Sequence, residues 1–362
     1  MTFEEARAAF PVLEHQAYLN AGSMGPLARA THDAMAAQSE RELAEGRSGP
    51  GFIEEMQNLR QAARERLAEL LRVPAEHLSL TSSTTDGCNI VLSGLDLGPE
   101  DEIVTTDEEH FGLLGPLHVS GARVVVARTR DRPADESFDA ILGCVTPRTR
   151  LLALSHISWL TGKLLPIREL KDETALPVLV DGAQSVGAIE VDARPFDFYT
   201  VSAQKWLCGP DGTGGLCVLD PERLRVAMPS YFAQAAYEVD GSFTSKPGAA
   251  RFDPGWLPPA SLAGLLSAID AAPPWRFVRA AEIAERCRER LSERYAVVTE
   301  PAQGTLVTFS PGKEDLDALV ARMYDDGVVV RRLPGTGWLR VSCGYWTSDE
   351  DLERLLAALE AE

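Results

Sequence analysis

The chain has 362 residues, of which 45% are hydrophobic and 25% are charged, as in ordinary soluble globular proteins. Its net charge of −19 argues against binding to nucleic acid or to an anionic membrane, because both are negatively charged. No apolar stretch of about 18 residues and no basic segment followed by an apolar core occurs, so we expect a cytoplasmic protein. The six cysteines and six histidines show no ligand spacing, so we predict neither a metal site nor a disulfide framework.

The first 90 residues are predicted to be mainly helical. Thr2 followed by Glu5 is a capping-box pattern for a short helix over residues 2–9. A loop of small residues at 20–25 leads to a helix starting near Pro26, and apolar residues at helical spacing predict helices over 27–45 and 51–72. Such a loop lets the backbone approach a ligand closely, although a plain turn explains it equally well.

A run of hydroxyl side chains follows the first predicted strand, Leu78–Leu80. Residues 81–87 open a helix, and the free N–H groups at a helix amino terminus bind anions such as a phosphate monoester. Taken alone, this pattern more often indicates a simple helix cap. Thr84 and Thr85 are the candidate phosphate donors.

Strands and helices then alternate as far as residue 219. The pattern predicts a mostly parallel sheet that is covered on both faces, because its strands are almost wholly apolar. We predict strands at 102–106, 123–127, 151–155, 178–180, 198–201 and 216–219, all buried, with a helix around 135–144.

Two of these strands end close to reactive side chains. Asp181 follows the strand Val178–Val180, at the edge where open α/β sheets bind ligands. Lys205 follows the next strand and precedes a glycine-rich turn. A desolvated lysine can form a Schiff base with an aldehyde, and a nearby aspartate can keep a pyridine nitrogen protonated. This pairing indicates pyridoxal phosphate. Ser202-x-x-Lys205 also matches the S-x-x-K of serine β-lactamases, but no S-D-N or K-T-G follows.

The motifs around these residues resemble a known signature. They are Asp181-Gly182-Ala183-Gln184, Ser202-Ala203-Gln204-Lys205-Trp206 and Gly209-Pro210. Together they resemble the class V aminotransferase family of fold-type I enzymes, which includes cysteine desulfurases, C–S lyases and isopenicillin-N-epimerase-like proteins. The resemblance implies an α/β fold with a large domain, built on a mostly parallel seven-stranded sheet, and a smaller α+β carboxyl-terminal domain. It also implies a homodimer with active sites near the interface.

The resemblance gives each cofactor residue a role. Lys205 would carry the Schiff base with pyridoxal 5′-phosphate, Asp181 would pair with the pyridine nitrogen, and Gln184 would bond the ring hydroxyl. Ser202 would bind the phosphate. Gln204 stands where many relatives have a phosphate-binding histidine, and it can still donate a hydrogen bond.

Three further positions follow from the same resemblance. The Thr-Thr-x-Gly step assigns Thr84 and Thr85 to the phosphate. His110 comes after Glu109 at a strand end, where relatives place a residue that stacks on the cofactor ring, and its pKa range also suits proton transfer.

The substrate pocket is expected to include the small-residue loop. Asn20, Ala21 and Gly22 are its candidate residues. Trp159 stands where relatives often have an asparagine that bonds the ring oxygen, and Trp256 stands near a threonine that binds the partner's phosphate. Both departures put these contacts in doubt.

From Pro258 onward the pattern predicts a second, α+β unit. It contains helices at 259–272, 276–293 and 314–326, strands at 295–298, 305–309, 328–330 and 338–342, and a helix from Ser348. We therefore divide the chain into a segment at 1–18 that packs on the small domain, a large domain at 19–257 and the small domain at 258–362. Arg340 resembles the arginine that grips a substrate carboxylate through its planar fork.

The reaction remains open among several chemistries. A persulfide-forming desulfurase needs a cysteine on a loop before the carboxylate-binding arginine, and the interval 331–338 contains none. Cys208 and Cys343 are interpreted as small core residues. β-Elimination by a C–S lyase acting on a cysteine-type amino acid needs the fewest extra groups. Epimerisation and transamination use the same residues, and a non-catalytic relative is a further alternative.

Overall fold

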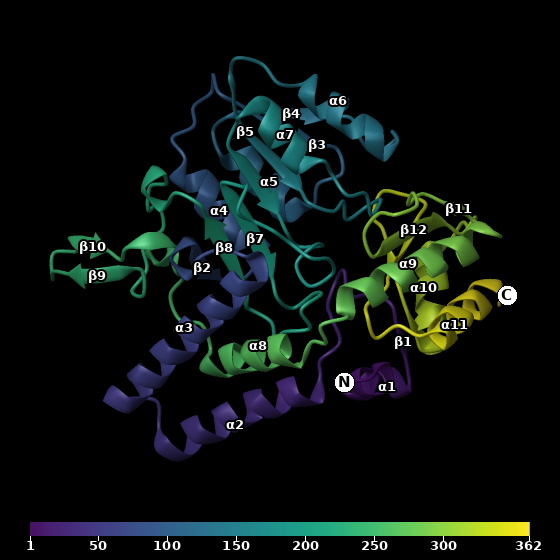
Figure 1. Cartoon of the computed structure of the whole chain (residues 1–362), viewed down its shortest axis with the longest axis horizontal. Helices are drawn as coiled ribbons and strands as arrows, with labels where there is room; N and C mark the ends of the chain where they lie inside the picture. Colours follow the sequence, from purple (N-terminus) through teal and green to yellow (C-terminus); the bar gives the residue numbers. More distant parts are fainter. Residues whose placement is uncertain (362) are drawn as a thin grey trace.

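The computed structural model describes residues 1–361 and builds them around two separate sheets (Figure 1). The larger sheet has seven strands, and only β8 runs antiparallel to the rest. The strands, in spatial order, are β2 (Leu78–Thr81), β8 (Gly214–Val218), β7 (Phe198–Ser202), β6 (Val178–Asp181), β5 (Thr149–Ser155), β3 (Glu102–Thr106) and β4 (Arg123–Ala127). The predicted α/β fold with a mostly parallel sheet is therefore confirmed.

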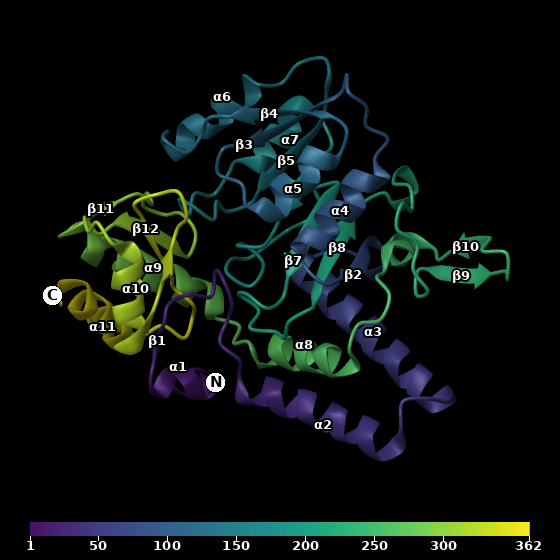
Figure 2. The same cartoon turned by 180° about the vertical axis from the view of Figure 1, so that it is seen from behind.

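Helices cover both faces of this sheet (Figures 1 and 2). One face packs against α4 (Thr84–Gly94) and α5 (Phe111–Val119). The other packs against α3 (Pro50–Leu71), α6 (Ser137–Leu142), α7 (Ile167–Thr174) and α8 (Pro259–Ala271). This two-sided burial explains the unbroken apolar runs of the central strands. The prediction that the strand at 123–127 is buried was wrong, because β4 lies at the sheet edge and is largely half-buried or exposed.

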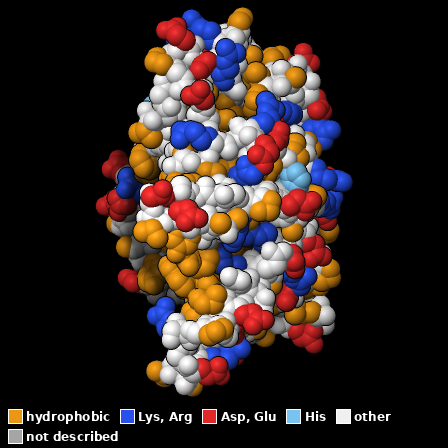
Figure 3. Space-filling model, turned by 90° about the vertical axis from the view of Figure 1, so that its left-hand side faces the viewer, with side chains coloured by type: hydrophobic (Ala, Val, Ile, Leu, Met, Phe, Trp, Pro, Cys, Tyr) orange, Lys and Arg blue, Asp and Glu red, His pale blue; other side chains and the backbone are white. Residues whose placement is uncertain are grey.

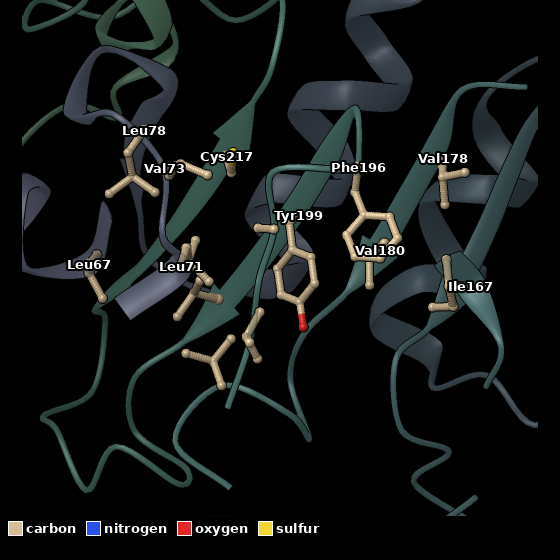
Figure 4. Packing of buried hydrophobic residues seen from close by; sticks show 14 of the residues in the cluster. Leu67, Leu71, Val73, Leu78, Ile167, Val178, Val180, Phe196, Tyr199 and Cys217 are labelled. Atoms are coloured by element: carbon tan, nitrogen blue, oxygen red, sulfur yellow. The ribbon is translucent and has the colours of Figure 1, made fainter. Parts of the chain in front are cut away.

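Tyr199 of β7 lies in the larger hydrophobic core beside Phe196 and Val180 (Figure 4). Its hydroxyl group leaves this cluster and bonds His156 Nδ1 and Ser185 Oγ, both at 2.6 Å. These groups lie directly behind the β6 carboxyl end, since the backbone N–H of His156 donates to the carbonyl of Asp181 at 3.0 Å. Packing and polar contacts thus fix the strand ends that carry the site.

The smaller sheet is antiparallel and belongs to the carboxyl-terminal part of the chain. Its strands, in order, are β11 (Ala296–Val297), β12 (Leu306–Ser310), β15 (Leu339–Ser342) and β14 (Arg331–Arg332). They pack with α9 (Arg276–Ser292), α10 (Leu316–Asp325) and α11 (Asp349–Glu360) around a second core. We call residues 276–361 the small unit.

The amino terminus packs on the small unit. The capping box of Thr2 and Glu5 is present and starts α1 (Phe3–Ala8). Arg7 in this helix forms a two-pronged ion pair with Asp351 of α11, at 2.6 and 3.0 Å. Next, β1 (Ala17–Tyr18) pairs in parallel with β13 (Val328–Val329).

Helix α2 (Arg29–Glu45) starts three residues after Pro26, later than predicted, and packs along α8. Helix α8 contacts both α2 and α3, which favours a boundary between the two units after α8 rather than at residue 258. Within residues 1–361, no helix is both long and apolar enough to cross a membrane.

The passage from β8 to α8 contains a projecting hairpin that was not predicted from the sequence. Its strands are β9 (Gln234–Tyr237) and β10 (Phe243–Ser245). The passage is anchored by Asp253, which is 1% exposed and accepts hydrogen bonds from Arg60 and Arg64 of α3 at 3.1 and 2.6 Å. Asp253 also accepts from the backbone N–H of Leu80 in β2 at 3.1 Å, so this buried, paired carboxylate holds the passage on α3 and on the large sheet.

Candidate active site

The carboxyl ends of β6 and β7 bring the predicted acid and amine to one edge of the sheet. Asp181 is the last residue of β6, is 3% exposed, and accepts a hydrogen bond from the backbone N–H of Ala183 at 2.9 Å. Lys205 lies in the turn that follows β7. Burial lowers the pKa of Lys205 to about 8, Arg340 and Arg331 add to this effect, and Asp181 opposes it. Lys205 thus reaches its neutral form far more readily than a solvated lysine does.

The backbone around Lys205 is held by several contacts. Cys208 N–H donates to the carbonyl of Lys205 at 3.0 Å, and Cys208 adopts a left-handed φ of 54°. From the amino-terminal loop, Gly25 N–H donates to the carbonyl of Gln204 at 2.7 Å. A turn closed from both sides places the amine in a defined position.

The predicted phosphate residues meet at the amino terminus of α4. The backbone N–H of Thr84 donates to Ser202 Oγ at 3.1 Å, which joins the helix start to the end of β7. Thr85 lies against the start of α5, where a Cβ on Gly112 would come within 2.6 Å of its hydroxyl. The buried Oε1 of Gln204 has no hydrogen-bond partner among residues 1–361. The hydroxyls of Thr84, Thr85 and Ser202, set at a helix amino terminus, fit a phosphate group, whereas Gln204 Oε1 is an acceptor that calls for a hydrogen-bond donor.

Gln184 is fixed on the opposite side of the pocket. Its Nε2 donates to the carbonyl of Gly22 at 2.9 Å, and its Oε1 accepts from Trp206 Nε1 at 3.0 Å. One N–H of the amide is left for a ligand oxygen, which suits the predicted contact with the ring hydroxyl.

His110 caps α5 with its ring. Its Nδ1 accepts from Gly112 N–H at 3.0 Å, so in the neutral ring the proton is on Nε2. Burial lowers the pKa of His110, and the positive charge of Lys205 lowers it further. The ring stands perpendicular to Trp159, with centroids 5.0 Å apart. His110 is therefore a ring oriented by Gly112 and Trp159, and its environment favours the neutral form.

Arg340, the residue predicted to bind a carboxylate, lies beside a second arginine, Arg331. Arg340 and Arg331 are direct partners across the antiparallel pair β15–β14. Arg340 is 1% exposed, and its Nη1 donates to the carbonyl of Trp159 at 3.0 Å. Ser23 Oγ accepts from Arg331 at 3.1 Å and from Arg340 at 3.4 Å. Burial lowers the pKa of Arg340 to about 9, and Arg331 adds to this effect.

Neither arginine forms an ion pair with a carboxylate in the described part of the chain, and the Nε of each is buried without a partner. A buried cation, Arg340, beside a half-buried one, Arg331, is costly without a counter-ion, so the pair is suited to an anion supplied from outside. Neither Arg331 nor Ser23 was among the site residues predicted from the sequence.

The small-residue loop lies directly over these arginines. Asn20 bridges to Ser342 of β15, and its side chain accepts from Ser23 Oγ at 2.8 Å. A Cβ on Gly22 would lie 2.8 Å from Arg340 Nη2 and 3.0 Å from Gln184 Oε1, so a larger residue here would displace these side chains. Ala21 is fully buried in a hydrophobic cluster, which leaves only its backbone to face a ligand.

Comparison with known proteins agrees with this geometry. The family model for class-V aminotransferases matches residues 17–355. The chain belongs to this family. Its members depend on pyridoxal 5′-phosphate, and so does this enzyme, because Lys205, Asp181 and the α4 terminus present a fitting amine, acid and anion site.

Relatives in the family carry out more than one reaction. The chain is 29% identical to isopenicillin N epimerase of Streptomyces clavuligerus, over 99% of this chain and 98% of the relative. It is 30% identical to a probable cysteine desulfurase of Methanothermobacter thermautotrophicus, over 75% of this chain and 70% of the relative. A solved structure of the cystine C–S lyase C-DES, in complex with its product cysteine persulfide, matches with a TM-score of 0.87 at 27% identity, covering 97% and 98% of the two chains.

Proposed function

We propose that this enzyme is a C–S lyase that removes the sulfur-bearing group from a cysteine-type amino acid without forming a persulfide on a protein cysteine. The hairpin from Arg331 to Arg340 carries this proposal. It has two arginines free to bind carboxylate and no thiol. Nearby Cys208 is buried, and burial raises its pKa, which disfavours the thiolate needed for sulfur transfer.

Each residue then has a role in the reaction. Asp181, Lys205, Thr84 and Ser202 would hold the cofactor, which when bound supplies an aldehyde for the substrate amine and an electron sink. Arg340 binds the substrate carboxylate through its planar fork and fixes the direction of Cα. Lys205, with its lowered pKa, accepts the proton from Cα. His110 covers the site from the α5 side and presents Nε2–H.

The second carboxylate-binding arginine supports a substrate with more than one anionic group. C-DES acts on cystine, which carries two carboxylates, and the pairing of Arg331 with Arg340 fits such a substrate. Ser23 joins the two guanidinium groups, so one carboxylate at each arginine would complete the site.

The test uses the purified holoprotein with cystine and with S-substituted cysteines. We expect pyruvate to be released without any added 2-oxo acid acceptor, and Lys205→Ala to lose both this activity and the absorbance of the covalently bound cofactor. Lys313→Ala, at an exposed position far along the chain, is the matched control and should retain both. A requirement for a 2-oxo acid would contradict the lyase and indicate an aminotransferase.

Epimerisation is the second candidate, because the match to isopenicillin N epimerase covers nearly the whole of both chains. The same incubations distinguish it. Chiral chromatography of the amino acid measures inversion at Cα. Inversion without release of pyruvate would favour the epimerase and overturn the lyase.

We also propose a homodimer. The side of the molecule that carries the β9–β10 hairpin shows a hydrophobic patch (Figure 3). In the passage that carries this hairpin, the exposed large apolar side chains are Met228, Tyr231, Tyr237, Val239, Phe243 and Trp256. Patches of this kind commonly mark protein interfaces. Light scattering should give twice the chain mass for the wild type, and Tyr237→Asp with Phe243→Asp should shift the population to monomer.

A further inference from the structure

A second buried carboxyl group lies behind the active site, and no role described above uses it. Glu109 is 5% exposed and precedes α5. It accepts hydrogen bonds from Thr106 Oγ1 at 2.7 Å and from the backbone N–H of Ser155 at 3.0 Å, as well as from Ser155 Oγ. These donors stabilise its ionised form, but no cation pairs with it in residues 1–361.

Glu109 and Asp181 share one buried compartment. Ser155, which holds the Glu109 carboxyl group, is the direct partner of Asp181 across the parallel strands β5 and β6. Facing residues in adjacent strands project their side chains from the same side of the sheet. The titratable groups that face Glu109 are Asp181 from β6 and Cys88 from α4, and His110 follows it in the chain. Burial raises the pKa of Glu109 to about 7, and the charge of Asp181 adds to this effect.

The preceding residue, Glu108, is also a buried glutamate, but it has a cationic partner. Glu108 is 1% exposed, but its Oε1 accepts from Lys163 Nζ at 3.0 Å and its Oε2 accepts from Thr161 Oγ1. The charge of Glu108 is therefore balanced by its ion pair with Lys163. Two consecutive buried glutamates thus differ in one respect, because only Glu109 leaves its negative charge uncompensated beside Asp181.

We propose that Glu109 is a positioning residue that adds a titratable negative charge beside Asp181 and so strengthens proton binding by the cofactor held there. The inference rests on the proposed placement of pyridoxal phosphate between Asp181 and Lys205. The carboxylate of Glu109, which is bonded to the strand next to that of Asp181, makes the site more negative. A more negative site keeps a proton on the bound cofactor up to a higher pH. Ser155 and Thr106 act through Glu109 by holding its charged form.

The test is a pH titration of the absorption bands of the holoprotein without substrate. Glu109→Gln keeps the shape and removes the charge, so the midpoint of the band change should fall by about one pH unit. Thr106→Val removes one hydrogen bond to the carboxylate and should give a smaller fall in the same direction. This second variant tests the idea even where Glu109→Gln fails to fold.

Glu108→Gln is the matched control. It should lower the Tm, because Lys163 is left unpaired, and leave the spectral midpoint unchanged. An unchanged midpoint in both Glu109→Gln and Thr106→Val would overturn the inference, as would an equal shift in Glu108→Gln. A wild-type protein that shows no cofactor band would instead contradict the cofactor site itself, so the two failures are distinguishable.

Discussion

At the scale of single residues, the site is defined by charges that the protein alone leaves unbalanced. Lys205, Arg340 and Arg331 bring three cations to one pocket, while Asp181 is the carboxylate among them. Placing like charges together in a buried pocket is unfavourable unless a ligand neutralises them. A phosphorylated cofactor and, in the proposed function, a carboxylate substrate would supply the missing negative charge.

The lowered pKa of Lys205 predicts how the apoprotein captures its cofactor. The neutral amine is the reactive form, and below its pKa of about 8 its fraction falls tenfold for each pH unit. The capture rate should therefore rise with pH up to about 8 and then level off. Stopped-flow absorbance after mixing with pyridoxal phosphate measures it. A capture rate that keeps rising with pH up to the ordinary lysine pKa would contradict the lowered pKa of Lys205.

The pair of arginines predicts a substrate-dependent effect. Arg340→Ala should raise KM roughly tenfold to 100-fold for every amino-acid substrate, because a charge-assisted hydrogen bond to carboxylate is lost. Arg331→Ala should raise KM more for a substrate with two carboxylates than for one with a single carboxylate. Comparing cystine with an S-alkyl cysteine in both variants measures the difference, and equal effects of Arg331→Ala on both would count against a second carboxylate site.

The sequence could place some of these residues but not others. Asp181 and Lys205 were predictable because each follows an apolar strand at the ligand-binding edge. Arg331 was missed because β14 has only two residues and gives no strand pattern. A signal was present, since Arg331 and Arg340 stand three residues before and three residues after the Pro-Gly-Thr-Gly turn at 334–337, as hairpin partners do. Ser23 is set by a contact across about 300 residues of chain, which no local pattern reveals.

At the scale of elements, the loop before α2 packs closely against the turn that carries Lys205. A Cβ on Gly25 would lie 2.0 Å from the carbonyl oxygen of Lys205 and 3.1 Å from Cys208 Cα. Both contacts are with backbone, so neither can be relieved by rotating a side chain.

Gly25→Ala should therefore destabilise the protein by about 1–3 kcal/mol and weaken cofactor retention, because the turn must shift. Gly51→Ala is the control: Gly51 lies in α3, its Cβ would meet nothing within 4 Å, and alanine should stabilise the helix slightly. Urea unfolding and cofactor dissociation measure both effects. Equal behaviour of the two variants would show that the loop does not constrain the lysine.

Elements with strong periodicity were predicted well, and irregular ones were not. The central strands and helices α3, α9 and α11 follow from apolar spacing because burial on one or two faces sets that spacing. The β9–β10 hairpin was missed because its strands are short and mostly exposed, so no core imposes alternation on them. Its anchor, Asp253, is fixed by arginines of α3 rather than by neighbours in sequence.

At the scale of the whole molecule, two buried groups titrate in opposite directions near the large sheet. Burial lowers the pKa of His156 from 6.5 to about 4, so its contribution to stability is present above pH 6.5 and is lost as pH falls through 4. Burial raises the pKa of Glu109 from 4.5 to about 7, so its contribution is present below pH 4.5 and is lost as pH rises through 7. Each contribution is about 3 kcal/mol, and the two nearly cancel.

Because the two contributions cancel, we expect that replacing one group will reveal the pH-dependent stability caused by the other. Relative to the wild type, His156→Asn should lose stability progressively as pH rises between about 4 and 7, because only the Glu109 component remains. Glu109→Gln should show the reverse slope. Chemical unfolding at a series of pH values measures both, and parallel curves for the two variants would rule out the compensation.

The segment from Leu19 to Gly25 touches both halves of the enzyme at once. Leu19 accepts from Ser342 N–H at 2.8 Å in the small sheet, whereas Gly25 donates to the turn that carries Lys205. Only six residues separate these anchors along the chain. The position of Arg340, in the same strand as Ser342, is therefore coupled to the position of Lys205 through this segment. An inhibitor that displaces one end of the segment should also displace the other end.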